Sequence, residues 1–106
     1  MIRVEIVRNR AGAIESFCVT GHANTAPHGA DIVCAGVSAL TDSAVLGLER
    51  HLGRKLTLQA GSGLLSVKLA APPDERTDAI LETMLLGIKE IARLYPRIVR
   101  IVEHGR

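Results

Sequence analysis

Residues 2–20 read IRVEIVRNRAGAIESFCVT, and this stretch decides the fold. Apolar and charged side chains alternate over residues 2–6, which is the period of a strand with one buried face. Residues 9–12, NRAG, have the composition of a turn, and residues 14–20 read as the strand that returns from it. The chain is therefore predicted to begin with a β-hairpin.

A long apolar helix is predicted after this hairpin and a Gly-containing loop at residues 21–30. The helix covers residues 32–52, with Asp31 as its N-cap and Gly53 at the position of a C-terminal cap. It is apolar around much of its circumference, which is typical of a central or interface helix. The elements predicted after it are strands at 56–59 and 64–70, a helix at 75–94 and a strand at 98–102.

The order ββαββαβ predicts an α+β fold, in which two helices pack on one face of a mostly antiparallel sheet. With 106 residues the chain has room for one hydrophobic core, so we expect a single domain over residues 1–106. The stripe of the second helix that is expected to face the sheet consists of Ile80, Met84, Ile88, Ile91 and Tyr95.

The composition excludes several classes of protein. Apolar residues make up 47% of the chain but aromatic residues only 2%, so the core must be aliphatic and a base-stacking platform is not expected. The net charge of +2 is far from the basic stripe of a nucleic-acid-binding protein. No signal-peptide h-region is expected after Met1, and no apolar stretch is expected to reach the about 18 residues of a membrane span, because Asp, Arg, His or Gly interrupts every candidate. We therefore expect a cytoplasmic protein that contacts neither membrane nor nucleic acid and keeps its thiols reduced.

Reactive and small residues gather on both sides of the loop, with Gly21 and His22 before it and Asp31, Cys34 and Ser38 after it. Cys34 is expected about one turn into the helix, where unpaired amide groups and the helix dipole stabilise the negative charge of a thiolate. A nearby histidine can remove the proton of such a thiol, and the loop can bring His22 back toward it. Cys34 as nucleophile and His22 as base therefore form a candidate catalytic pair.

The neighbours of this pair each have two interpretations. Asp31 either orients the imidazole of His22, as the third member of a triad does, or caps the helix. Ser38 lies one turn after Cys34 and either hydrogen-bonds to substrate or sulfur or bonds back to a helix carbonyl. Gly21 either lets the backbone approach a substrate closely or simply allows a turn.

The motif around these residues resembles a known family. Gly21-His22-Ala23, then Gly29, then DIVCAGVSAL over residues 31–40 resemble the signature of the ribosomal-processing cysteine protease family, often called Prp. The resemblance covers nearly the whole chain, because the length and the ββαββαβ order also agree. The carboxyl-terminal half agrees in pattern only.

The resemblance implies a specific reaction. It implies that Cys34 is the nucleophile and His22 its base, with Asp31, Ser38 and Gly21 in support. The implied substrate is the precursor of the twenty-seventh protein of the large bacterial ribosomal subunit, from which these proteases remove a short amino-terminal extension. Members of the family are homodimers, so a homodimer that needs no cofactor or metal is expected.

One alternative is a zinc-binding module. Cys18, His22, His28 and Cys34 are of the residue types that bind zinc. The sequence lacks a C-x-x-C element, and Cys18 stands between two apolar residues of a strand, where an inert core residue is expected.

A second alternative is a non-enzymatic protein that binds the ribosome or RNA. Arg93, Arg97 and Arg100 near the carboxyl end would provide the positive charge. The default explanation of such residues is a solvated face.

Overall fold

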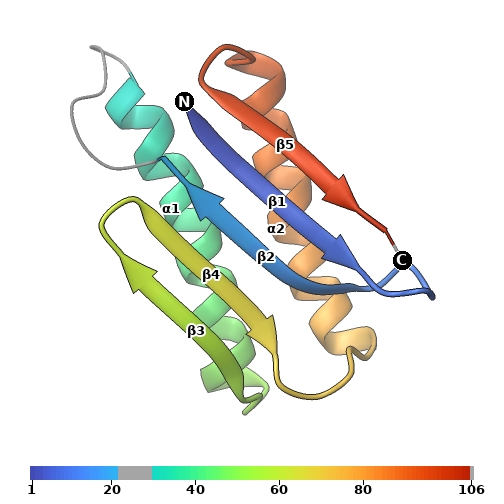
Figure 1. Ribbon diagram of the computed structural model, residues 1–106. Coiled ribbons are helices and arrows are strands. Elements are labelled where there is room, and N and C mark those ends of the chain that lie inside the picture. The colour runs from blue at the N-terminus through green and yellow to red at the C-terminus, as the bar shows by residue number, and fades with distance from the viewer. Residues whose placement is uncertain (22–29, 106) are drawn as a thin grey trace.

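The computed structural model describes residues 1–21 and 30–105, and of residues 30 and 31 it describes the backbone alone. The ββαββαβ order is confirmed (Figure 1). The elements in chain order are β1 (Ile2–Arg8), β2 (Ile14–Thr20), α1 (Ala30–Leu46), a π-helical turn η1 (Gly47–His51), β3 (Leu56–Gly61), β4 (Leu64–Leu69), α2 (Glu75–Leu94) and β5 (Val99–His104).

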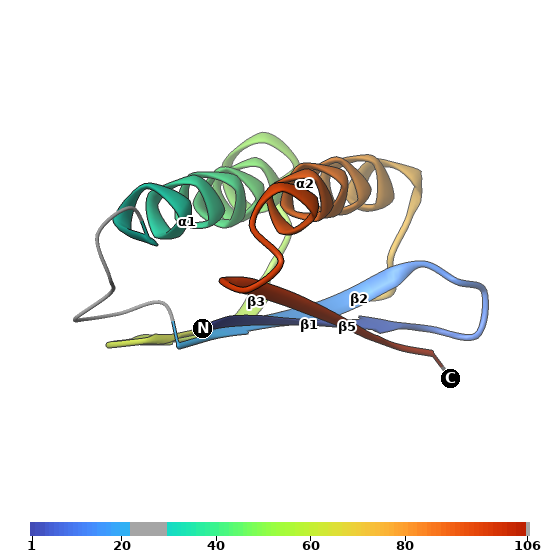
Figure 2. The ribbon, with the colours of Figure 1, turned by 90° about the horizontal axis from the view of Figure 1, so that it is seen from above.

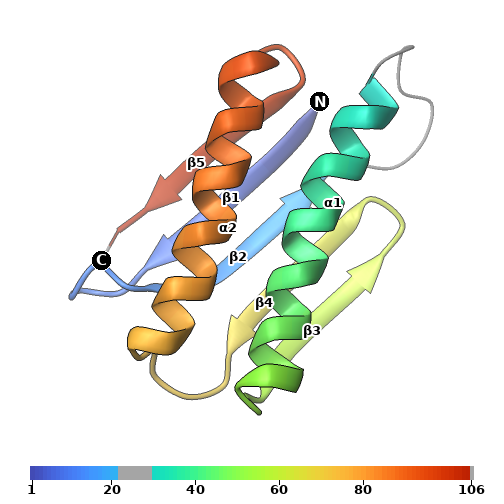
Figure 3. The same cartoon turned by 180° about the vertical axis from the view of Figure 1, so that it is seen from behind.

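One five-stranded sheet has the strand order β3-β4-β2-β1-β5. Neighbouring strands are antiparallel except for β1 and β5, which run parallel. Both helices lie on the same face of the sheet, and no described element covers the other face (Figure 2). α1 lies on the side of β3 and β4, and α2 on the side of β1 and β5 (Figure 3). The predicted fold class, an α+β fold with a mostly antiparallel sheet, is therefore confirmed.

The alternation in the first hairpin fills the core between sheet and helices. The inward side chains of β1 are at most 1% exposed, and Phe17 and Val19 of β2, which pair with Ile6 and Val4, are 2% exposed. Apart from Phe17 and Met84, the buried hydrophobic residues are Ala, Val, Leu and Ile. This is the aliphatic core that the low aromatic content predicts.

The start of α1 corrects the capping role predicted for Asp31. Ala30 is already helical, so Asp31 lies inside the first turn rather than at the N-cap. An acidic residue is favourable at both places because of the helix dipole, and composition alone did not separate them. At the other end η1 continues the helical path, and the N–H of Leu52 donates to the carbonyl of Gly47 at 3.0 Å. Gly53 then has φ +65°, the left-handed conformation expected just after a helix.

The helical stretch Ile32–His51 is long and apolar enough to cross a membrane, by length and composition alone. This differs from the expectation that no apolar stretch reaches that length. The stretch contains too few charged and polar residues to bring its mean hydropathy below that of a membrane span. Core helices of proteins outside membranes pass the same test. Here one face of the stretch packs on the sheet, where Val37 and Leu48 are at most 1% exposed.

α2 begins at a capping box that follows the Pro72-Pro73 break. The side chain of Asp74 accepts hydrogen bonds from the backbone N–H groups of Arg76 and Thr77, at 2.9 Å each. The hydroxyl of Thr77 accepts the N–H of Asp74 at 3.0 Å, which satisfies a further donor at this helix end.

The buried stripe of α2 is broader than predicted and ends earlier. Met84 and Ile88 are buried as expected, and Leu81 and Leu85 join them. Tyr95 was wrongly assigned to this stripe, since it is 46% exposed. The backbone leaves the helical conformation at this residue, with φ −131° and ψ 62°, so helical spacing no longer applies.

Glycines bring α1 and α2 close together. A Cβ atom at Gly47 would lie 3.2 Å from the side chain of Ile80, and one at Gly87 would lie 2.9 Å from that of Leu40. These contacts define the flank of α1 that faces α2. Helical geometry places Cys34 on the other flank, toward the β3–β4 hairpin.

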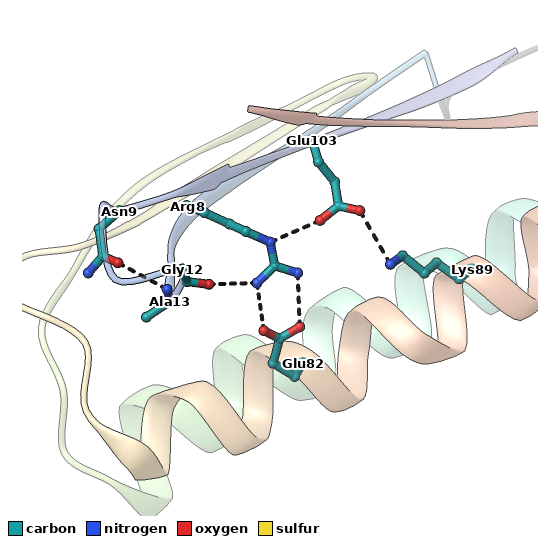
Figure 4. Close-up of polar contacts among 7 residues, drawn as sticks. All are labelled: Arg8, Asn9, Gly12, Ala13, Glu82, Lys89 and Glu103. Carbon is teal, nitrogen blue, oxygen red and sulfur yellow. Dashed lines mark hydrogen bonds and ion pairs between the residues drawn. The ribbon is translucent and has the colours of Figure 1, made fainter. Parts of the chain in front are cut away.

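The first hairpin is tied to α2 and β5 by a cluster of charges around Arg8 (Figure 4). The guanidinium of Arg8 donates to both carboxylate oxygens of Glu82 (2.6 and 3.1 Å), to Glu103 (2.9 Å) and to the carbonyl of Gly12 (2.8 Å). Lys89 lies 3.3 Å from the other oxygen of Glu103. The hydrogen bond from Arg8, against some desolvation and with help from Lys89, holds the pKa of Glu103 below its usual range.

Candidate functional site

Cys34 is half-buried at the edge of the core, at the start of the second turn of α1. The Cα–Cβ bonds of a helix tilt toward its N-terminus, so the side chain extends over the first turn. The helix dipole acts mainly within that first turn. Cys34 is the fifth residue of α1, whereas a cap at Asp31 would have made it the third, so it lies further from this helix end than predicted.

Ser38 and Asp42 follow Cys34 along the same flank of α1, at intervals of four residues. Ser38 is half-buried and lines a small cavity between α1 and the β3–β4 hairpin. Val19 of β2 lines the same cavity, so the end of β2 lies next to this part of α1. The hydroxyl that bonds back within the helix is that of Thr41, which donates to the carbonyl of Ser38 at 3.2 Å.

Gly21, which directly follows β2, has a structural role in the turn. Its φ is +79°, and a Cβ atom there would lie 2.4 Å from the carbonyl oxygen of Met1. Its N–H donates to the carbonyl of Gly63 at 3.0 Å. Only glycine can occupy this position, and these contacts fix the backbone of Gly21, the residue directly before His22.

The predicted base lies outside the described residues. This applies to His22 together with the other residues of 22–29, and of Asp31 only the backbone is described. β2 ends and α1 begins at the same end of the molecule (Figure 1). The pairing of His22 with Cys34 and the role of the Asp31 carboxylate stay predictions.

Cys18 is not a core residue, which corrects the expectation for it. It pairs with Glu5 and Ser66, while Phe17 and Val19 on either side fill the core, so its thiol faces the uncovered side of the sheet. The strand pattern alone did not show that this second face is open. Partial burial raises the pKa of Cys18, the Glu5 carboxylate raises it further, and a hydrogen bond with Ser66 opposes the change. A raised pKa disfavours the reactive thiolate.

The two cysteines lie on opposite faces of the sheet, because Cys34 belongs to the helix layer. This is incompatible with a zinc site built from Cys18, His22, His28 and Cys34 together. Among the residues that the structure describes, no three or more His, Cys, Asp or Glu side chains gather as metal ligands would.

The three arginines of the ribosome-binding alternative have separate surroundings. Arg93 forms an ion pair with Glu90 on its own helix. Arg100 pairs with Arg3 across the parallel strands on the uncovered face, and Arg97 stands in the connection between α2 and β5. The contacts of Arg93 are those of a solvated face, which is the default explanation.

The sequence did not predict several residues that line the cavity next to Ser38, among them Asp42, Ala60 and Leu65. Asp42 could have been found, since it follows Cys34 by two helical turns. Ala60 and Leu65 carried no such signal, because only the packing of the hairpin under α1 brings them to this flank.

Comparison with known proteins agrees with this fold. A family model described as cysteine protease Prp matches residues 1–100. A Bacillus subtilis protein named ribosomal processing cysteine protease Prp is 34% identical over 107 aligned positions, which cover 95% of this chain and 96% of that protein.

Two crystal structures are similar over almost their whole length. One, from Streptococcus mutans, has a TM-score of 0.90 at 32% identity and covers 100% of this chain and 96% of its own. The other is an essential ribosomal processing protease Prp from Staphylococcus aureus in complex with a substrate peptide. It has a TM-score of 0.91 at 26% identity and covers 97% of this chain and 99% of its own.

Proposed function

Because this chain belongs to the cysteine protease Prp family, we propose that it removes a short amino-terminal extension from the precursor of the twenty-seventh protein of the large bacterial ribosomal subunit. Cys34 is the nucleophile of this reaction and His22 is its base. The observation that carries the proposal is the position of Cys34, half-buried on the flank of α1 and one turn from a cavity that β2 and the β3–β4 hairpin also line.

The proposed reaction consists of two acyl transfers. The imidazole of His22 takes the thiol proton of Cys34, and Sγ attacks the carbonyl carbon of the scissile bond. The tetrahedral intermediate collapses, the C–N bond breaks, and the imidazolium gives its proton to the leaving amine. The same imidazole then deprotonates a water molecule, which hydrolyses the thioester, releases the new carboxyl group and restores the thiol.

Three further residues support this pair in the proposal. Asp31 orients the imidazole, Ser38 hydrogen-bonds to substrate or sulfur, and Gly21 fixes the end of β2 before His22. We expect Ser38→Ala to lower kcat/KM about tenfold, the equivalent of one hydrogen bond. The free energy of unfolding measured in urea should change little, which separates a role in the reaction from a role in folding.

The test is cleavage of an extended ribosomal-protein precursor, followed by mass spectrometry. Cys34→Ala and His22→Ala each abolish cleavage if the pair acts as proposed. Cys18→Ala is the matched control, since it removes the other thiol, and it leaves cleavage largely intact. Cleavage at the rate of the unsubstituted protein by Cys34→Ala would refute the assignment.

We also propose that the protein is a cytoplasmic homodimer. Large apolar side chains are exposed on both helices, among them Ile32 (76% exposed) and Leu86 (67%), and a second copy would cover such surface. Sedimentation equilibrium should give twice the mass of the chain. Cell fractionation should find the protein with the cytoplasm, and recovery of a monomer at every concentration would contradict the dimer.

A further inference from the structure

The uncovered face of the sheet, which is turned toward the viewer in Figure 1, is positively charged. The side chains that alternate with the buried residues of β1 point to this face, and the strand pairing places their partners there as well. Among the described strand positions on this face, Arg3, Lys68 and Arg100 are cationic and exposed, and Glu5 is the only acidic residue. The resulting excess of two positive charges equals the net charge of +2 of the whole chain.

Two of these cationic side chains stand next to each other without an anion between them. Arg3 and Arg100 pair directly across the parallel strands β1 and β5, which lie about 4.8 Å apart. Like charges in this arrangement destabilise a sheet. Glu5 lies 3.6 Å from Arg3 and 3.1 Å from Nε2 of His104, whereas the side chains of Lys68 and Arg100 form no hydrogen bond or ion pair with any residue that the structure describes. An anion that bridges the two guanidinium groups would relieve the repulsion.

The chemistry of this face suits the backbone of a nucleic acid better than its bases. A guanidinium group matches the geometry of a phosphate. The half-buried Thr20 and Ser16 pair with Arg3 and Lys68 and add hydroxyl groups, which donate to phosphate and sugar oxygens. The single Phe of the chain is in the core, and the single Tyr is at the end of α2. No aromatic ring is therefore available on this face for stacking on bases.

A lipid surface suits this face less well. A membrane-binding surface combines cations with large exposed apolar side chains. On the described strands, Leu58 is the only large apolar side chain that is exposed, and it pairs with the buried Val67, which places it on the helix side of the sheet. The named relatives act in ribosomal processing, and the ribosome is rich in RNA. Of the polyanions that fit the charge, RNA is therefore favoured.

We propose that the uncovered face of the sheet binds the phosphate backbone of RNA through Arg3, Lys68 and Arg100. This differs from the expectation drawn from the net charge, which does not reveal on which face the charges lie. Arg3 pairs with Thr20, the last residue of β2, so bound RNA would lie at the end of the sheet that leads to His22. The inference goes beyond the proposed function and does not depend on it.

The test measures the affinity of the full chain for labelled single-stranded RNA by fluorescence anisotropy. Three phosphate contacts predict that the affinity falls about 20-fold between 50 and 200 mM salt. Oligomers of uridine and of adenosine should bind with affinities within about twofold of each other, because phosphate contacts carry no sequence information. Absence of binding at the lower salt concentration, or a strong preference for one base, overturns the inference.

Substitutions on the two sides of the sheet locate the binding surface. Arg3→Gln and Arg100→Gln should each weaken RNA binding several-fold and lower the slope of log affinity against log salt by about 0.7, because each removes one phosphate contact. Glu5→Gln removes the only acidic residue of the face and should strengthen binding several-fold. Arg93→Gln is the matched control, since it removes the same charge from α2 in the helix layer, and it should keep the affinity within about twofold. Equal weakening by Arg93→Gln and Arg3→Gln would indicate attraction to the net charge alone and overturn the inference.

Two further measurements separate the remaining outcomes. Circular dichroism checks that the variants fold, and cosedimentation with vesicles of phosphatidylcholine and phosphatidylserine tests a membrane as partner. Tighter binding to the vesicles than to RNA overturns the proposal. RNA binding is measured without substrate, so it is independent of cleavage. A protein that binds RNA but cleaves no precursor supports this inference and refutes the protease, and one that cleaves but does not bind RNA does the reverse.

Discussion

At the scale of single residues, the surroundings of the two cysteines predict different reactivity. Cys34 extends over the first turn of a helix, where amide groups stabilise negative charge. Cys18 lies on the sheet beside the carboxylate of Glu5, and burial together with this charge raises its pKa. Because its pKa is raised, a smaller fraction of Cys18 is thiolate at neutral pH than in an ordinary cysteine.

We therefore expect iodoacetamide at neutral pH to label Cys34 well before Cys18. Glu5→Gln removes one cause of the raised pKa, so it should speed the labelling of Cys18 and leave Cys34 as the internal reference. Peptide mapping by mass spectrometry at timed intervals measures both rates. Equal labelling rates in the native protein would count against an activated Cys34.

Gly21→Ala should be far more damaging than the same change at another left-handed glycine. Gly12 has φ +90° with open space around its Cβ position, so Gly12→Ala should cost about 1 kcal/mol from backbone strain alone. At Gly21 the carbonyl of Met1 must also move, and we expect a loss of about 2–4 kcal/mol. Urea unfolding measures both, and similar losses at the two sites would contradict the close contact.

At the scale of elements, the charge cluster around Arg8 joins the first hairpin to α2 and β5. The side chain of Arg8 is 23% exposed and bonds to Glu82, Glu103 and a backbone carbonyl, so Arg8→Ala leaves several partners unsatisfied. We expect a loss of about 1–3 kcal/mol in urea unfolding. Arg93→Ala is the control: its ion pair with Glu90 is solvent-exposed, and no measurable loss is expected.

The same cluster predicts a dependence of stability on pH. The pKa of Glu103 is lowered in the folded protein, chiefly by its hydrogen bond with Arg8. Its stabilising contribution is therefore complete above the ordinary carboxyl pKa of 4.5 and is lost as the pH falls through the lowered folded value. Unfolding free energies measured from pH 6 down to pH 3 should fall less steeply in Arg8→Ala. An identical slope in both proteins would exclude this linkage.

Whether each segment forms a helix or a strand was predictable from the sequence, because this depends on a local pattern of residues. Alternation around Val4 marks a strand, and the Pro-Pro-Asp break marks the start of α2. The order of the strands and the parallel pairing of β5 with β1 were not predictable, since they depend on contacts between the two ends of the chain. The motif identified Cys34 within the candidate site, while Ala60 and Leu65 join this flank only through packing.

At the scale of the whole molecule, every described element packs around one core between one sheet and two helices. We therefore expect the single domain predicted for residues 1–106 to unfold in one cooperative step. In scanning calorimetry the calorimetric and van't Hoff enthalpies per cooperative unit should agree. The unfolding enthalpy should be about 70 kcal/mol per chain near 60 °C. Two separated transitions would contradict a single domain, and a midpoint that rises with protein concentration would support the dimer.

The contact between Gly21 and the carbonyl of Met1 has a practical consequence for protein engineering. It places the amino terminus next to the segment that leads to His22, so a purification tag fused before Met1 would emerge beside the proposed active site. β5 runs parallel to β1, and its last residues therefore lie at the opposite end of the sheet. A tag fused to the carboxyl terminus would lie far from the proposed active site and is therefore the better choice for measuring cleavage.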